Sequence, residues 1–308
     1  MLKLVFMGTP DFAVPSLEAL IAAGYPVAAV VTGVDKPRGR GQHLTPTPVK
    51  HAALRHNIPL LQPSGMRDPE FAAALRACAP DLAVVVAFRI LPREVFAIPS
   101  RGTFNLHASL LPCYRGAAPI NWALIHGMHE TGVTTFFLED AVDTGNLLLQ
   151  SRLQVGPDDD AGTVHDRLAM LGARLVVETV QQIEAGTIVP LPQDNTLASP
   201  APKIFREQCH IRWNAAALQI HNLVRGLSPL PCAWTIHGGR LLKIYKTRVT
   251  ERVADGSPGT VLVSGHTLSV ASADRTLEIL ELQQEGHRRM TAAEFLRGYN
   301  VVSGECFL

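Results

Sequence analysis

Residues 104–127 read F-N-L-H-A-S-L-L-P-C-Y-R-G-A-A-P-I-N-W-A-L-I-H-G, and residues 139–145 read E-D-A-V-D-T-G. The first of these segments begins with apolar, β-compatible residues, and a strand there places Asn105 and His107 on the same side because they are two residues apart. Asp143 follows after a further strand-like segment. The sequence therefore predicts that an amide, an imidazole and a carboxylate meet at the end of a sheet, where open α/β folds bind ligands.

The chemistry of these three side chains indicates a type of reaction. The Asn105 amide can donate to a developing oxyanion, His107 can exchange a proton near neutral pH, and Asp143 can orient the imidazole or accept protons itself. Neither Ser109 nor Cys113 is clearly placed as a nucleophile, so the set suits direct attack by a substrate amine on a carbonyl-level carbon. The alternative on spacing alone is that the amide and imidazole are ordinary turn or core residues.

The two quoted segments closely resemble the signature of the folate-dependent formyltransferases. In that family the matching Asn, His and Asp are catalytic, which implies catalytic roles for Asn105, His107 and Asp143. The resemblance also implies 10-formyltetrahydrofolate as co-substrate and no metal. The residues that it places at the folate are Ser109, Leu110, Leu111 and Pro112, with Phe88, Ile90 and Leu91 from a second segment, A-F-R-I-L-P.

Two positions depart from the family pattern. Cys113 stands where the family usually has a basic residue, and A-F-R-I-L-P at residues 87–92 replaces the common A-Y-G-I-L-P. The resulting Phe88 and Arg89 change details of the expected pterin pocket and leave the chemistry as it is.

The first part of the chain alternates strand-like and helix-like segments, from a buried apolar strand at residues 2–7 to a long amphipathic helix at 163–185. This alternation predicts a doubly wound, mainly parallel, Rossmann-like α/β sheet, which we assign to a catalytic domain at residues 1–188. The first loop reads G-T-P-D-F at residues 8–12, without the G-x-G-x-x-G fingerprint, and this counts against an NAD enzyme.

Residues 35–48 read D-K-P-R-G-R-G-Q-H-L-T-P-T-P and predict an exposed, irregular loop. Such a charge run is usually a solvated loop; the alternative is a basic finger that contacts phosphates. The resemblance favours the finger, because an insertion reading D-x-P-x-G-R-G is typical of the branch of the family that acts on methionyl-tRNA. It implies tRNA contacts for Arg38 and Arg40, with Arg40 ranked first.

The Pro-rich residues 189–207 predict a linker, and residues 208–308 contain short strand-like segments separated by turns. Five or so such strands without helical crossovers indicate a small C-terminal β-barrel, with the oligonucleotide-binding barrel as the obvious candidate. From Gln208 onward there are eleven Lys and Arg against eight Asp and Glu, a modest basic bias. Together with the resemblance, this suggests a tRNA-binding domain, and the candidate tRNA contacts on one strand are Lys243, Lys246 and Arg248.

Composition sets further bounds. The five cysteines among 308 residues are scattered, without metal-ligand spacing, which fits a reduced cytoplasm. We expect no membrane segment, because no apolar run approaches the length of a membrane span. We also expect a monomer. The net charge of +1 does not by itself indicate a nucleic-acid binder.

Two alternatives stand beside formyl transfer from 10-formyltetrahydrofolate to methionyl-initiator-tRNA. One is a related enzyme that formylates amino-sugar nucleotides or hydrolyses 10-formyltetrahydrofolate, against which the basic loop and the barrel argue. The other is a non-catalytic RNA-binding protein on a degenerate enzyme scaffold, against which Asn105, His107 and Asp143 argue.

Overall fold

The computed structural model describes residues 1–38 and 43–308. The chain divides into two compact units, of which the first comprises Met1–Gly116, Thr131–Leu153 and His165–Ala201, and the second comprises Ala117–Glu130, Gln154–Val164 and Pro202–Leu308. Two short segments, Ala117–Glu130 and Gln154–Val164, therefore belong to the second unit although they lie between stretches of the first. The predicted domain boundaries divide the chain into consecutive ranges and do not place these two segments in the second unit.

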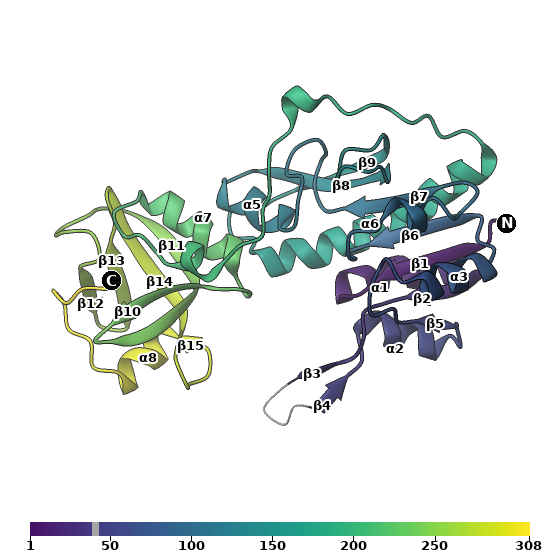
Figure 1. The fold of residues 1–308 in the computed structure, drawn as a ribbon. Helices are drawn as coiled ribbons and strands as arrows, with labels where there is room; N and C mark the ends of the chain where they lie inside the picture. The colour runs from purple at the N-terminus through teal and green to yellow at the C-terminus, as the bar shows by residue number, and fades with distance from the viewer. Residues whose placement is uncertain (39–42) are drawn as a thin grey trace. The chain divides into compact units, whose positions relative to one another are not determined.

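The first unit is built on a seven-stranded sheet (Figure 1). In spatial order its strands are β5 (Leu60–Leu61), β2 (Val27–Val31), β1 (Leu4–Gly8), β6 (Leu82–Val86), β7 (Thr103–His107), β8 (Glu130–Phe137) and β9 (Leu147–Gln154). The pairings from β5 to β7 are parallel, whereas β8 runs antiparallel to β7. The five residues of β1 and of β6 are all buried, as expected for central parallel strands. The predicted Rossmann-like, mainly parallel sheet is confirmed.

Helices cover both faces of this sheet (Figure 1). They are η1 (Asp11–Ala13), α1 (Val14–Ala22), α2 (Pro48–Arg55), α3 (Pro69–Ala77), α4 (Arg93–Phe96) and α6 (Ala161–Ala185). On one face, Phe71 and Leu75 of α3 pack against Val5 and Val85 of the central strands. On the face that carries Leu106, α6 comes so close that a Cβ at Gly172 would overlap the Leu106 side chain. No helix in the described part of the chain is long and apolar enough to cross a membrane.

The basic segment contains regular structure. β3 (Lys36–Arg38) and β4 (His43–Thr45) pair antiparallel, so the prediction of an irregular loop is wrong at these residues. The base of this hairpin is held in place because Asp35 accepts hydrogen bonds from Lys50 Nζ at 2.7 Å and from the Gln62 amide at 3.0 Å. The Lys50 bond, followed by the Gln62 bond, lowers the pKa of the Asp35 carboxyl.

The second unit contains an antiparallel sheet. In spatial order its strands are β10 (Ala233–His237), β11 (Arg240–Val253), β14 (Arg275–Gln284), β13 (Thr267–Ala271) and β12 (Val261–Ser264), with β15 (Met290–Thr291) paired to β14. The C-terminal residues 304–308 bond to both edges, because Val261 N–H donates to the Glu305 carbonyl and Ile236 N–H to the Leu308 carbonyl, each at 2.8–2.9 Å. Pairing of both edge strands is what closes a sheet into a barrel. The predicted small β-barrel is confirmed.

Helices and one buried core complete the second unit. The helices are α5 (Pro119–Ile125), η3 (Arg206–Cys209), α7 (Ala217–Leu227) and α8 (Ala292–Gly298). Trp213, Phe295 and Phe307 are each at most 5% exposed and belong to a single hydrophobic core. Trp213 is therefore a packing residue of this core, and its Nε1 donates to Thr235 at 3.0 Å.

Hydrogen bonds at the start of α8 make the folding stability of this unit sensitive to acidic pH. The Thr291 N–H donates to Glu294 at 2.9 Å, and this bond, with Arg288 at 2.8 Å, lowers the pKa of Glu294 from 4.5 to about 2. Because the folded-state pKa is depressed, the stabilisation is present above pH 4.5 and is lost as the pH falls toward 2.

We therefore expect Glu294→Gln to remove part of this acid sensitivity. The stability difference between the wild type and the variant should shrink as the pH falls from about 5 to about 2. Urea unfolding followed by tryptophan fluorescence measures it, since Trp122, Trp213 and Trp234 all lie in the second unit. A difference that stays constant over this range would contradict the assignment.

Candidate active site

The proposed catalytic strand is β7, at the point where the sheet changes from parallel to antiparallel pairing. It pairs with β6 on one side and β8 on the other, with Asn105 opposite Phe136 and His107 opposite Thr134. Since Leu106 packs toward α6, the alternation of a strand directs Asn105 and His107 to the opposite face. The structure agrees with the prediction that these two side chains lie on one side of a strand.

His107 is nearly buried and is held at both ring nitrogens. Its Nε2 lies 2.9 Å from the carbonyl oxygen of Tyr114, and its Nδ1 lies 3.8 Å from Oδ2 of Asp143. Because a carbonyl only accepts, Nε2 carries a proton, and the neutral ring presents its lone pair at Nδ1. Asp143 is therefore placed next to the nitrogen that is able to gain or lose a proton.

Asp143 itself is oriented by a backbone donor. The Gly116 N–H donates to Oδ2 at 2.9 Å, and the carboxylate is 13% exposed. The residue adopts a left-handed backbone with φ 58°, a conformation that Asp tolerates better than most residues. Close packing fixes the turn further, because a Cβ at Gly145 would overlap the carbonyl of Phe137.

The amide of Asn105 is half-buried and makes no side-chain hydrogen bond to any residue that the structure describes. An amide buried in this way normally has a partner. Its donor is thus available to a substrate oxygen, which agrees with the predicted oxyanion role without testing it.

The predicted folate segment is tied down by hydrogen bonds behind it. Ser109 is fully buried and donates to the Cys113 carbonyl at 2.6 Å, so its hydroxyl shapes the turn. Thr134 accepts the Leu111 N–H at 3.1 Å, and the Gln150 amide donates to the Leu111 carbonyl at 2.8 Å. Leu110 and Pro112 are partly exposed, whereas Leu111 is buried.

The second predicted folate segment has a mixed environment. Leu91 is 6% exposed and belongs to the core beneath the sheet, whereas Ile90 is 73% exposed. Phe88 is partly buried, and the Arg89 guanidinium lies 5.6 Å from its ring centre while donating to the Pro63 carbonyl at 2.8 Å. The unusual Phe88–Arg89 pair is therefore a packed unit, in which the arginine fixes a neighbouring loop.

The predicted tRNA-contacting residues lie in several places. Arg38 is in β3, and Arg40 lies outside the described residues. Lys243, Lys246 and Arg248 are all on β11, but the pairing of β11 with β14 shifts at Tyr245.

The three cations on β11 have different surroundings. Lys243 lines a cavity of about 430 Å³ together with Trp234, whereas Lys246 lines a different cavity of about 150 Å³. Arg248 is bound by Glu278 through two contacts of 3.0 and 2.6 Å.

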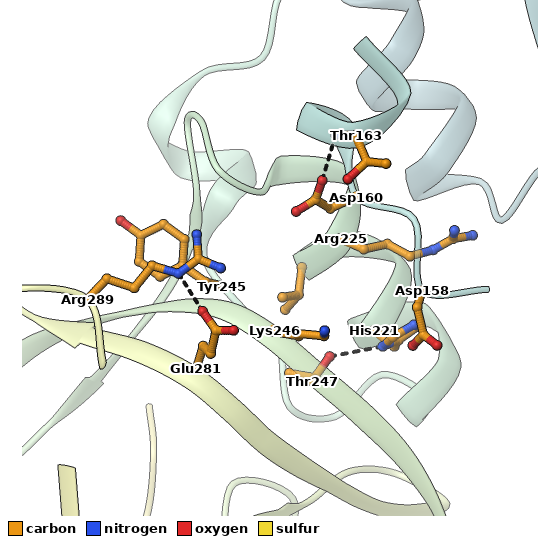
Figure 2. A pocket seen from close by; sticks show the side chains of 11 residues that line it. Asp158, Asp160, Thr163, His221, Arg225, Tyr245, Lys246, Thr247, Glu281 and Arg289 are labelled. Atoms are coloured by element: carbon orange, nitrogen blue, oxygen red, sulfur yellow. Dashed lines mark hydrogen bonds and ion pairs between the residues drawn. The ribbon is translucent and has the colours of Figure 1, made fainter. Parts of the chain in front are cut away.

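Figure 2 shows the smaller cavity and its mixed charge. Lys246 is exposed and makes no ion pair with any described residue, whereas Arg289 is paired with Glu281 at 2.6 Å. The buried Arg225 donates to the carbonyls of Gly156 and Asp159 at 3.1 and 3.3 Å. Of the exposed cations around this cavity, Lys246 is the one whose charge no carboxylate offsets at ion-pair distance in the described residues.

Several site groups have no signal in the sequence. The Tyr114 carbonyl and the Gly116 N–H are backbone groups, so the side chains of these residues give no indication of the contacts. Gln193, in the predicted linker, donates to the Asp143 carbonyl at 2.9 Å. Its neighbours Pro192 and Asp194 give no indication of that contact. No cluster of three or more His, Cys, Asp or Glu suited to a metal is present in the described part of the chain.

Comparisons with known proteins agree with this geometry. The family described as "Formyl transferase" matches residues 2–180, and "Formyl transferase, C-terminal domain" matches residues 203–300. The methionyl-tRNA formyltransferase of Caldanaerobacter subterraneus subsp. tengcongensis is 46% identical over 305 residues, covering 98% of this chain and 99% of the relative. That of Moorella thermoacetica is 49% identical over 306 residues, covering 99% and 98%.

Solved structures share the fold at lower identity. An N-formyltransferase from Helicobacter canadensis, in complex with folinic acid and dTDP-3-aminofucose, has a TM-score of 0.70 and 21% identity over 94% of this chain and 100% of that chain. HypX from Aquifex aeolicus, in complex with tetrahydrofolic acid, has a TM-score of 0.66 and 17% identity over 100% of this chain and 51% of that chain. On the family matches and the full-length relatives together, this chain belongs to the formyl transferase family, among the methionyl-tRNA formyltransferases.

Proposed function

We propose that this protein transfers the formyl group of 10-formyltetrahydrofolate to the α-amine of methionyl-initiator-tRNA, giving N-formylmethionyl-tRNA for translation initiation. The observation that carries the proposal is the set of His107, Asp143 and Asn105, whose amide bonds to no residue that the structure describes, on a chain 46–49% identical to methionyl-tRNA formyltransferases along its length. Folate and tRNA are accordingly its two substrates.

We assign the catalytic roles to Asn105, His107 and Asp143. The methionyl amine attacks the formyl carbon, and a C–N bond forms while the carbonyl oxygen becomes an oxyanion. Asn105 donates to that oxyanion, and so does His107 when it is protonated at Nδ1. Asp143 holds the imidazole and relays the amine proton toward the folate nitrogen. The intermediate then collapses, the bond to that nitrogen breaks, and the nitrogen leaves as an N–H.

The anchoring of His107 supports the choice of nitrogen. Because Nε2–H is bound to the Tyr114 carbonyl, Nδ1 is the position where a proton can be exchanged without breaking that bond. The Asp143 carboxylate lies 3.8 Å from that nitrogen. The folate is proposed to contact Leu110, Leu111 and Pro112, supported behind by Ser109, and also Phe88, Ile90 and Leu91.

For the domains, we propose residues 1–188 as catalytic domain, 189–207 as linker and 208–308 as tRNA-binding barrel. The tRNA contacts assigned here are Arg38, Arg40, Lys243, Lys246 and Arg248. We further propose that the protein acts in the cytoplasm, where its tRNA substrate is made, and acts as a monomer.

The direct test incubates the protein with 10-formyltetrahydrofolate and charged initiator tRNA and measures formylmethionine after ester hydrolysis. A dTDP-amino-sugar acceptor and a reaction without acceptor run in parallel. Formylation of the tRNA alone supports the proposal. Formylation of the sugar, or release of formate without an acceptor, would replace it with one of the two related activities.

Lys246 provides a test of the tRNA contacts. We expect Lys246→Ala to weaken tRNA binding and to reduce the slope of log K against log salt by about one, because an unpaired lysine on a phosphate releases about one counterion. Arg248→Ala, on the same strand, should change the slope less, because Glu278 already holds that guanidinium. Equal slopes for Lys246→Ala and the wild type would remove Lys246 from the interface.

A further inference from the structure

The segment 191–201, here called the bridging segment, lies against the catalytic loops although the sequence predicts a linker there. At its start, Leu191 and Leu147 exchange two backbone hydrogen bonds of 2.8 and 2.9 Å. Near its end, the Ser199 carbonyl accepts the Arg115 N–H at 2.9 Å, and the Ala201 N–H donates to the Arg115 carbonyl at 2.6 Å. The segment is thus fixed to the strand after Asp143 and to the loop after His107.

One side chain of this segment reaches both loops. The Gln193 Nε2 donates to the carbonyls of Asp143 at 2.9 Å and Gly145 at 2.8 Å. Its Oε1 accepts from Arg115 Nη2 at 2.6 Å and from Nε at 3.1 Å. Both donor hydrogens and the acceptor oxygen of the amide are therefore used, and a side chain with this arrangement is difficult to replace.

The two loops joined in this way carry the groups that orient the proposed acid–base pair. The first holds Asp143, at φ 58°, and the second holds the Tyr114 carbonyl and the Gly116 N–H. Arg115 lies between Tyr114 and Gly116 in the sequence. Because Gln193 bonds to both loops, it fixes the position of the Asp143 carboxylate relative to the His107 imidazole. The Nδ1 of that ring lies 3.8 Å from Oδ2 of Asp143.

We propose that Gln193 is a positioning residue for formyl transfer: its amide holds the Asp143 turn against the Tyr114–Gly116 loop and so sets the geometry of His107 and Asp143. The inference rests on the proposed function. Gln193 contacts neither proposed catalytic side chain directly, and it acts through backbone carbonyls and Arg115.

Two substitutions at Gln193 distinguish its bonds to the Asp143 turn from its bonds to Arg115. Gln193→Ala removes all four bonds. Gln193→Glu keeps an acceptor for Arg115 but replaces the donor by an oxygen that faces the carbonyls of Asp143 and Gly145. We expect both variants to lower kcat by about 10–100-fold, the usual loss when a supporting hydrogen-bond partner of a site is removed, with little change in KM for either substrate.

Two controls make the test specific. Asn195→Ala removes one contact to Arg115 Nη2 at 2.8 Å and leaves the Asp143 turn untouched, and Gln182→Ala removes an exposed glutamine of α6 that bonds Glu178. Both should keep wild-type kcat. Thermal unfolding of every variant is measured alongside, so that a loss of kcat in a folded protein is distinguished from a loss of fold.

The outcomes decide the proposal. A fall in kcat for Gln193→Ala and Gln193→Glu at unchanged KM supports it. Wild-type kcat in Gln193→Ala would overturn it. Wild-type kcat in Gln193→Glu would also overturn it, because only the bonds to Arg115 would then matter. The crystal structure of Gln193→Glu gives a readout independent of activity: the Asp143–His107 separation should exceed the 3.8 Å of the wild type. If the wild type itself makes no formylmethionine, the proposed function fails, and this distance still tests the positioning role.

Discussion

His107→Ala is expected to lower kcat by about 10²–10⁴-fold while leaving the affinity for initiator tRNA unchanged. The imidazole is 7% exposed and lies between the Tyr114 carbonyl and the Asp143 carboxylate, so no water or neighbouring side chain takes over its geometry on truncation. The loss falls on the transition state, because the oxyanion and the migrating proton exist only there. Single-turnover formylation at saturating tRNA measures it, with tRNA affinity measured separately by filter binding.

The control for this variant is His165→Ala. His165 is a partly exposed histidine of the same unit that also lies beside a carboxylate, Asp166, at 2.9 Å, but it is outside the site. Its removal should leave turnover unchanged. If His107→Ala turned over normally at saturation and bound tRNA poorly, the acid–base role would be wrong and His107 would be a binding residue.

Asn105→Ala has the next largest expected effect, a loss of about 10²–10³-fold in kcat. The amide is half-buried and free of side-chain hydrogen bonds to the described residues, so its donor is available to the developing oxyanion. Truncation removes that donor without breaking a bond that stabilises the fold, and the midpoint of thermal unfolding should change little.

The isosteric Asn105→Asp distinguishes this role from packing. It keeps the shape of the side chain and replaces the donor by a carboxylate, which repels an oxyanion, so it should lose at least as much turnover as Asn105→Ala. Activity retained in Asn105→Asp and lost in Asn105→Ala would mean that the shape of the side chain matters and its donor does not.

The sequence predicted the architecture of both units because the signals for it are local. Buried apolar strands such as residues 82–86 and alternating helices indicate a doubly wound sheet, and short strands without crossovers indicate a barrel. The direction of β8 was not predicted, because an eight-residue buried strand carries the same pattern whether it is parallel or antiparallel to β7. The hairpin of β3 and β4 was missed because glycines and prolines outweigh its short pairing.

The site was predictable only as far as side chains define it. The motif fixes Asn105, His107 and Asp143 as candidates, and their spacing fixes the first two on one side of β7. It says nothing of the Tyr114 carbonyl or the Gly116 N–H, which are backbone groups brought in by the fold. Gln193 could not be predicted from the sequence, for a different reason. It lies 50 residues beyond Asp143, and its role depends on a long-range contact from a segment whose composition indicates a linker.

The central claim is that an imidazole and a carboxylate act as one unit on one formyl group. The measurement that tests it most directly is a double-mutant cycle of His107→Ala and Asp143→Asn, read as single-turnover formylation of methionyl-tRNA. Asp143→Asn keeps an acceptor for the Gly116 N–H and removes the charge beside Nδ1. If the two residues act together, the double variant should be no slower than the slower single variant. A double variant whose loss equals the product of the two single losses would contradict the account.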